Sequence, residues 1–160
     1  MQHSSDILIS DTSCLILLSK IDKVDLLQSV GLRVYITPAI AKEYGKELPS
    51  WIKIKEPANI HYCKILEIDV DAGEASAIAL SLEMKNAILI IDDLKGRKLA
   101  DKLGLKYSGT FGLILRAKKS GVIPSVKPIL EKVKSTDFRF SDDLFDYTLK
   151  EAGEKKDDIS

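Results

Sequence analysis

The sequence predicts one α/β domain with a mainly parallel central sheet, and three observations lead to this prediction. Short apolar runs rich in β-branched residues alternate with segments of helical spacing along the chain. The first run, 7–10, is apolar almost throughout, as expected of a strand covered on both faces. The 160 residues contain neither an internal repeat nor a Pro/Gly/Ser-rich linker, and this length is enough to bury one sizeable core.

The expected strands and helices are bounded by turn and capping residues. Strands are expected at 7–10, 33–36, 87–91 and, shorter, at 106–107. Helices are expected at 14–30, with a break near Asp22 that caps the second part, and at 38–45, 71–85, 94–103, 110–120, 128–134 and 142–152. Residues 60–68 fit either a strand or a short helix. These elements predict a single domain over residues 1–153, followed by a flexible tail at 154–160.

Several boundaries rest on residues with specific backbone preferences. Thr37 before Pro38 predicts a helix start, because threonine accepts a hydrogen bond from the first turn and proline fits the first helical position. Asp71 and Glu74 have the spacing of a capping box, in which each residue satisfies a free amide of the other. Glycines are expected to end four of the helices, at positions 31, 45, 104 and 121.

Composition excludes several classes of protein. Lys plus Arg and Asp plus Glu both number 24, so the net charge is zero and no whole-molecule basic field attracts nucleic acid. No apolar run is long enough to span a membrane, and the first residues lack a signal-peptide pattern. Cys14 and Cys63 are expected to be reduced thiols of a cytoplasmic protein, with a disulfide as the alternative. His3 and His61 are too few for a zinc site.

Four acidic loci are expected at one edge of the sheet. A helix that follows a parallel strand begins at the carboxyl edge, where open α/β sheets place their ligands. Asp11 ends the first strand, and the pair Asp92-Asp93 ends the strand at 87–91. Glu74 lies in the first turn of its helix, and Glu43 lies only about 8 Å along the helix that begins at Pro38. We therefore expect these carboxylates to converge.

Each acid also has a purely structural alternative. Asp11 and Asp93 could cap the helices that follow them, and Glu74 could complete the capping box. Glu43 could be a solvated helix residue, and Asp92 an exposed strand end. If the strand continues through 92 and 93, these two side chains point to opposite faces, so only one of them is expected at the site.

Convergence of several carboxylates has a chemical consequence. Neighbouring negative charges repel each other and raise each other's pKa, so that a bound cation or a very wet site is needed to accommodate them. A hard divalent ion such as Mg²⁺ or Mn²⁺ suits a few carboxylate ligands and several waters. The sequence leaves open whether one or two ions bind.

Four motifs carry a resemblance to a known family over residues 6–121. They are Ile9-Ser-Asp-Thr-Ser13, Thr37-Pro-Ala-Ile-Ala-Lys-Glu43, Gly73-Glu-Ala-Ser-Ala-Ile-Ala79 and Ile90-Ile-Asp-Asp93. Together they resemble the PIN-domain nucleases, and more narrowly the bacterial and archaeal branch that includes toxins of the VapC type. Segments 95–100 and 109–115 look like one subfamily of that branch. The third acid of the family is often Asp and is Glu74 here, and a small polar residue often precedes the fourth acid, which favours Asp93 over Asp92 as the ligand.

The resemblance implies a three-layer α/β/α PIN-like fold and a Mg²⁺- or Mn²⁺-dependent endoribonuclease. It implies that hydrolysis leaves a 5′-phosphate. The implied catalytic residues are Asp11, Glu43, Glu74 and Asp93, and the candidate metal ligands are the same four residues together with Asp92. Thr12 and Ser13 could orient Asp11 or a metal-bound water, or instead cap the helix at Cys14.

Substrate and partners follow from the same resemblance. RNA that approaches an acidic site needs cations around it, and Arg97 is the preferred candidate because its planar fork suits phosphate oxygens. The other candidates are Lys95, Lys98, Lys42, Arg116, Lys118 and Lys119. Their alternative is a solvated helix face. The implied partners are an RNA substrate and a small antitoxin. The apolar faces of the last three helices are expected to be mostly core, with a homodimer contact as the alternative.

Two other functions remain as alternatives. A phosphoacceptor signalling domain also combines a parallel sheet, strand-terminal acids and Mg²⁺, although here the acid pair comes late in the chain and no strand-end lysine is evident. An inactive PIN-like scaffold that only binds RNA or protein is the second alternative, and the presence of an acid at all four loci disfavours it.

Overall fold

The computed structural model describes residues 6–154, and it confirms the α/β prediction. Its sheet has the strand order β3-β2-β1-β4-β5, and every neighbouring pair is parallel. The strands are β1 (Ile7–Ser10), β2 (Arg33–Ile36), β3 (Ile52–Ile54), β4 (Ala87–Ile90) and β5 (Tyr107–Ser108). The chain adds β2 and β3 on one side of β1 and then β4 and β5 on the other, which places the strand before Asp11 at the centre.

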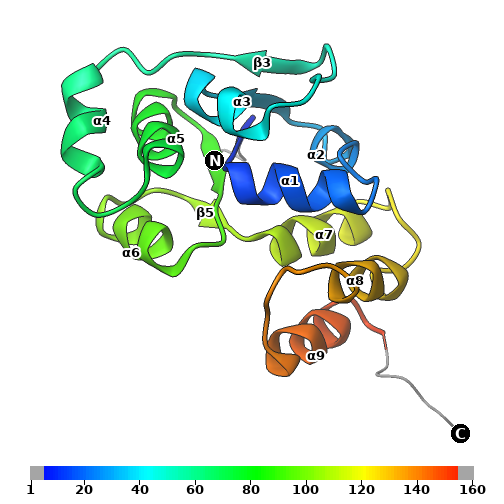
Figure 1. Cartoon of the computed structure of the whole chain (residues 1–160). Coiled ribbons are helices and arrows are strands. Elements are labelled where there is room, and N and C mark those ends of the chain that lie inside the picture. The colour runs from blue at the N-terminus through cyan, green and yellow to red at the C-terminus, as the bar shows by residue number, and fades with distance from the viewer. Residues whose placement is uncertain (1–5, 155–160) are drawn as a thin grey trace, which may run out of the picture.

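Helices cover both faces of this sheet. They are α1 (Thr12–Lys20), α2 (Leu26–Ser29), α3 (Pro38–Tyr44), α4 (Ile60–Leu66), α5 (Ala72–Glu83), α6 (Leu94–Lys102), α7 (Thr110–Lys119), α8 (Lys127–Lys134) and α9 (Asp142–Glu151). Figure 1 shows α4, α5 and α6 on one side and α1, α2 and α7 on the other, with α3 in contact with both α1 and α5. This arrangement is the expected three-layer α/β/α fold.

The central strand is buried because both faces of the sheet are covered. Leu8 and Ile9 have no exposed surface. On α5, Ala75, Ala77 and Ala79 are fully buried as well. Their small side chains let α5 pack closely against β1 and β4, and this packing fixes the position of the first turn of α5 relative to the ends of those strands.

The structure confirms the break expected near Asp22, decides between the alternatives for 60–68, and differs from the expected elements in one cap and one strand. Asp22 lies in the turn between α1 and α2 at a φ of +58°, and Asp25, not Asp22, precedes α2. Residues 60–66 form a helix, not a strand, because Asn59 caps it by accepting a hydrogen bond from the Tyr62 N–H at 3.0 Å. β3 was not expected, since only Ile52 of its three residues is buried. Both cysteines are free thiols.

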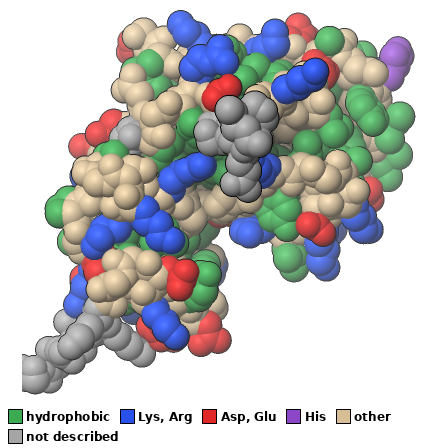
Figure 2. All heavy atoms as spheres, turned by 180° about the vertical axis from the view of Figure 1, so that it is seen from behind, with side chains coloured by type: hydrophobic (Ala, Val, Ile, Leu, Met, Phe, Trp, Pro, Cys, Tyr) green, Lys and Arg blue, Asp and Glu red, His purple; other side chains and the backbone are tan. Residues whose placement is uncertain are grey.

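Charged side chains of both signs are interspersed over the surface. Figure 2 shows Lys and Arg side chains scattered over the whole of one face without forming a single field. Apolar side chains gather at the edge of this face where α4 lies, and Ile60, Ile65 and Ile68 are each more than half exposed. In the part of the chain that the structure describes, no helix is both long and apolar enough to cross a membrane.

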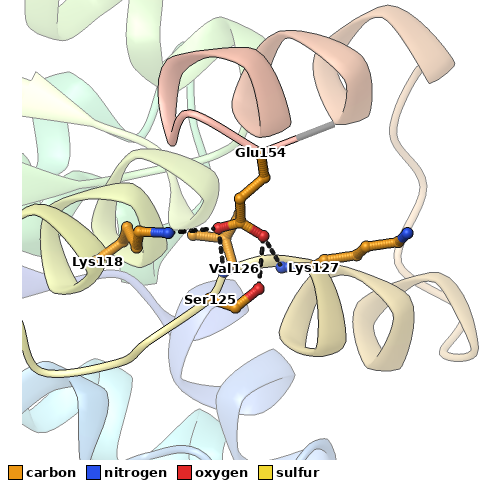
Figure 3. Close-up of polar contacts among 5 residues, drawn as sticks. All are labelled: Lys118, Ser125, Val126, Lys127 and Glu154. Atoms are coloured by element: carbon orange, nitrogen blue, oxygen red, sulfur yellow. Dashed lines mark hydrogen bonds and ion pairs between the residues drawn. The ribbon is translucent and has the colours of Figure 1, made fainter. Parts of the chain in front are cut away.

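The end of the domain is anchored by Glu154. Its carboxylate accepts hydrogen bonds from the Ser125 hydroxyl, from the backbone N–H groups of Val126 and Lys127, and from the Lys118 ammonium at 3.0 Å (Figure 3). The start of α8 has no side-chain cap of its own, so Glu154 supplies one from across the fold. The prediction that the flexible tail begins at 154 is therefore wrong for this residue, and 155–160 lie outside the described residues.

Replacing Glu154 with glutamine is expected to destabilise the domain by about 1–3 kcal/mol, because charge-assisted hydrogen bonds to a mostly buried carboxylate are lost. Burial by itself would raise the pKa of Glu154, but these hydrogen bonds outweigh it and lower the pKa to about 2. The measurement is a urea unfolding curve at neutral pH. Glu151→Gln, on the exposed surface of α9, is the matched control and should leave the midpoint unchanged. An equal midpoint for both variants would contradict the prediction.

Candidate active site

Asp11 lies at the centre of the carboxyl edge. Its backbone N–H donates to the carbonyl of Ile90 at 3.0 Å, which fixes it beside the end of β4. Its Oδ1 accepts the Cys14 N–H at 2.8 Å and its Oδ2 accepts the Asp92 N–H at 3.3 Å. The side chain is 1 % exposed. Asp11 is therefore the N-cap of α1, and the same two hydrogen bonds hold its carboxylate at the sheet edge.

Glu43 reaches this edge from α3. Its Oε1 accepts a hydrogen bond from the Thr12 hydroxyl at 2.9 Å. Gly73, at the start of α5, lies directly against this pair, because a Cβ on Gly73 would stand 2.0 Å from Glu43 Oε1 and 3.2 Å from Thr12 Oγ1. Three helices thus meet at the Glu43 carboxylate, and a glycine is needed for their close approach.

Gly73→Ala is expected to displace the Glu43 carboxylate while leaving the fold intact. The clash is with the end of a flexible side chain, and alanine favours a helix over glycine by up to about 1 kcal/mol, so the melting temperature should stay close to that of the parent. If these acids hold the metal that the resemblance implies, Mn²⁺ affinity and any RNA cleavage that depends on it should fall about tenfold or more, the range seen when metal ligands lose their support. Cleavage assays and calorimetric Mn²⁺ titration check this, and unchanged values for both would contradict it.

Glu74 lies between the other acids. The Asp71 carboxylate accepts its N–H at 2.8 Å and so caps α5, as the spacing predicts. A Cβ on Gly96 would stand 3.6 Å from Glu74 Oε2, so the carboxylate of Glu74 reaches the first turn of α6. Glu74 therefore joins the start of α5 to the start of α6.

Asp92 and Asp93 both border the site. β4 ends at Ile90, so the alternation that predicted opposite faces for the two side chains does not apply. Asp93 caps α6 by accepting the Gly96 N–H at 3.1 Å. Both oxygens of Asp92 accept hydrogen bonds from Thr110, from its N–H at 2.8 Å and its hydroxyl at 2.5 Å. Asp92 thereby supplies a cap to α7, which has none of its own.

For Asp11 and Asp93 the capping alternative is correct, and the same positions place these acids at the carboxyl edge. The side chains of Asp11, Asp71 and Asp93 cap the N-termini of α1, α5 and α6. Asp92 accepts a hydrogen bond from the first N–H of α7, although it is far from that helix in the sequence. Because these helices all start at the carboxyl edge of a parallel sheet, capping by acids itself concentrates negative charge there.

The pKa of Asp11 shows the effect of this concentration. Burial, then the negative charge of Asp92 and more weakly that of Glu74, raise the pKa of Asp11 from 3.8 to about 8. The hydrogen bonds from Cys14 and Asp92 act in the opposite direction and are too weak to offset burial. Asp11 is therefore largely protonated at neutral pH without a compensating cation.

Glu74 is shifted in the same direction. Partial burial, then the charges of Asp71 and Asp93, and also that of Glu43, raise the pKa of Glu74 from 4.5 to about 7. Glu74 therefore lies within electrostatic range of Asp71, Asp93 and Glu43. Asp11 is buried, Glu74 is half-buried, and Glu43 and Asp93 are exposed. The exposure of the acids therefore increases from the sheet edge toward solvent.

The donor chemistry fits a hard divalent cation, since every candidate ligand is a carboxylate and the two most buried acids have raised pKa values. The side chains do not close around one point, however. Among residues 6–154, no three Asp, Glu, His or Cys side chains stand close enough together to hold an ion as they are placed.

Thr12 and Ser13 have roles different from those expected. Asp11, and neither of these residues, accepts the Cys14 N–H, so the capping alternative for them is wrong. Thr12 orients Glu43 instead of Asp11. Ser13 is exposed and lines a hollow of about 300 Å³ with residues that include Phe138 and Arg139.

The basic candidates divide between two faces of α6. Arg97 lies 5.3 Å from the centre of the Tyr107 ring, and a Cβ on Gly109 would stand 2.8 Å from one of its guanidinium nitrogens. Lys95 and Lys98 are exposed on another face, along a groove with Lys102. Arg97 therefore lies near Asp92, because both side chains border Gly109. Lys95 and Lys98 lie on a different face of α6.

Sequence reasoning missed Thr110 as a site residue. It orients Asp92 with both its N–H and its hydroxyl, and Gly109 allows Asp92 to approach, because a Cβ there would stand 2.8 Å from Asp92 Oδ1. The available signal was a Gly-Thr pair at the start of a helix, directly after a short strand. By itself that signal indicates only an ordinary helix start.

Fold and site together define an α/β domain with acids gathered at the carboxyl edge of a parallel sheet. A family model described as PIN domain matches residues 7–154, and the chain belongs to this family. PIN domains are generally nucleases and generally use divalent metal ions. This membership favours a nuclease over the phosphoacceptor alternative. A comparison with curated proteins gives no match.

Proposed function

We propose that this chain is a divalent-metal-dependent endoribonuclease. The observation that carries the proposal is the gathering of four acidic loci from β1, α3, α5 and the end of β4 at one edge. Asp11, Glu43, Glu74 and Asp93 would hold Mg²⁺ or Mn²⁺. When bound, such an ion binds a phosphate oxygen and lowers the pKa of a water.

The chain's own residues have distinct parts in this proposal. Thr12 holds Glu43, and Thr110 holds Asp92, so both carboxylates are oriented before any ligand arrives. We assign Asp92 to positioning, because both of its oxygens already accept hydrogen bonds from Thr110 and its N–H donates to Asp11. Asp93 keeps one carboxylate oxygen outside its cap and is the better ligand.

In the cell, we propose that the chain acts as a cytoplasmic toxin of the VapC-like branch, held inactive by a small antitoxin. The motifs at 9–13 and 90–93 support this branch. The exposed apolar side chains of Ile60 and Ile65 on α4 support a protein partner, which could also be a second copy of the chain.

The test is cleavage of RNA with Mn²⁺, with Mg²⁺ and with EDTA. We expect internal cuts that leave 5′-phosphates, only when one of the metals is present, and no cutting of single-stranded DNA of the same sequence under matched conditions. Cleavage that persists in EDTA would exclude a metal-dependent mechanism.

A catalytically inactive PIN-like scaffold is the second candidate. It is favoured by one observation, namely that no three acid side chains in the described part of the chain surround one point. Calorimetric titration with Mn²⁺ separates the two candidates. Binding that Asp11→Asn abolishes supports the nuclease, and the absence of any binding to the parent protein supports the scaffold.

A further inference from the structure

The exposed face of α6 carries a stripe of lysines. Lys95, Lys98 and Lys102 are three and four residues apart, so their side chains share one face of the helix. All three are exposed, and none of them forms an ion pair with any residue between 6 and 154. The stripe extends about 10 Å along the helix.

This stripe borders a groove that leads to the acids. The groove has a volume of about 320 Å³, and Ile68, Asp69 and Leu99 complete its lining. One wall is the segment that runs from Ile68 into the first turn of α5, where Glu74 lies. The other wall is α6, which begins directly after Asp93. Both walls therefore end at the proposed active site.

The groove combines positive charge with an exposed apolar surface. Three lysines face a single acid, Asp69, in a chain whose net charge is zero. Ile68 is 81 % exposed, the largest value among the exposed large apolar side chains in the described part of the chain. A cationic groove that follows the backbone is a feature of proteins that bind single nucleic acid strands. Here the apolar surface beside it is aliphatic, and it can contact a base without stacking on it.

We propose that single-stranded RNA lies in this groove, with successive phosphates on Lys95, Lys98 and Lys102 and a base against Ile68. The lysines are spaced about 4.5 and 6 Å apart along the helix axis, so three phosphates, one at each lysine, would span the stripe. The proposal rests on the proposed function, since the groove would lead the strand to the acids. Arg97 faces the other side of α6 and takes no part in the track.

The experiment measures binding of a fluorescein-labelled oligouridylate by anisotropy, in an Asp11→Asn background with Mg²⁺, over salt concentrations of about 50–200 mM. The test variant carries Lys95→Gln, Lys98→Gln and Lys102→Gln. The matched control carries the same three changes at the exposed lysines 53, 85 and 132, which lie on β3, after α5 and on α8.

Each lost phosphate contact should lower the salt slope by about 0.7, which corresponds to roughly fivefold in affinity at 0.1 M salt. We therefore expect the test variant to bind about 100-fold more weakly, with a slope smaller by about 2, and the control to bind like its parent. Ile68→Ser should weaken binding about fivefold with an unchanged slope, because it removes an apolar contact and no charge.

If the test and control variants bind RNA equally, the proposal that RNA binds along the three lysines is wrong. The groove would then be better explained as a contact site for a protein partner with an acidic face. In that case cleavage by the wild-type chain would show that the proposed function still stands. If the parent protein binds no RNA and the wild-type chain cleaves none, the track and the proposed function both fail.

Discussion

Replacing Asp11 with asparagine is expected to reduce metal-dependent RNA cleavage by at least about 10³-fold. A bound metal contributes several kcal/mol to transition-state stabilisation, and about 4 kcal/mol corresponds to this factor. Asp11 is the most central acid, because it contacts the Asp92 backbone and its pKa responds to both Asp92 and Glu74. The measurement is the cleavage rate in Mn²⁺, normalised to the folded protein concentration.

The substitution should leave the fold intact. Asparagine is as good an N-cap as aspartate, and its one side-chain oxygen can still accept the Cys14 N–H at 2.8 Å. The longer hydrogen bond from the Asp92 N–H, at 3.3 Å, loses its acceptor, so a loss of stability of about 1–3 kcal/mol is expected with the fold retained. Asp101→Asn makes the same chemical change at an exposed position near the end of α6 and should retain full activity. Cleavage by a folded Asp11→Asn protein at the rate of this control would contradict the assignment of Asp11 to the site.

The metal-free protein is expected to lose stability as the pH rises from about 5 to 8, by about 3 kcal/mol or roughly 5–10 °C in melting temperature. The pKa values of Asp11 and Glu74 are raised in the folded state, to about 8 and about 7, so the folded protein binds more protons than the unfolded chain in this window. The stabilising contribution of the neutral acids is complete below about pH 4 and is lost as the pH rises through their folded-state pKa values.

Glu154 has the opposite dependence. Its pKa is lowered to about 2, so its contribution is present above about pH 4.5 and is lost as the pH falls toward 2. Stability should therefore be greatest near pH 5. Melting curves in EDTA from pH 3 to 9 check this, and Mn²⁺ should raise the melting temperature more at pH 8 than at pH 6, because it competes with protons for the same oxygens. A melting temperature that rises steadily between pH 5 and 8 in EDTA would contradict the prediction.

The fold and the set of acids could be predicted from sequence because each has a local signal. Buried β-branched runs predicted β1, β2 and β4. The pair Thr37-Pro38 predicted that α3 begins at Pro38, which is where it begins in the structure. β3 could not be predicted in the same way, since it is an edge strand with one buried residue whose place depends on pairing with β2. The convergence of the acids followed from a topological rule, that helices begin at the carboxyl edge.

The contacts within the site could not be predicted, because they join residues far apart in the chain. The Thr12–Glu43 and Thr110–Asp92 hydrogen bonds depend on the angles at which α3 and α7 pack, which no local pattern determines. The spacing of Lys95, Lys98 and Arg97 already places them on different faces of α6, but which of these faces borders the groove depends on how the helix is rotated against β5. The anchoring of Glu154 depends on α8 lying close to the end of α9.

The double use of the acids bears on how this family diverges. A relative without nuclease activity would still need an N-cap at positions 11, 71 and 93, and aspartate there would satisfy selection for folding alone. Glu43 begins no helix, is exposed, and is held by a single hydroxyl. Among relatives of this chain, a change at position 43 or 74, neither of which caps a helix, is therefore more informative about loss of the proposed activity than a change at a capping position.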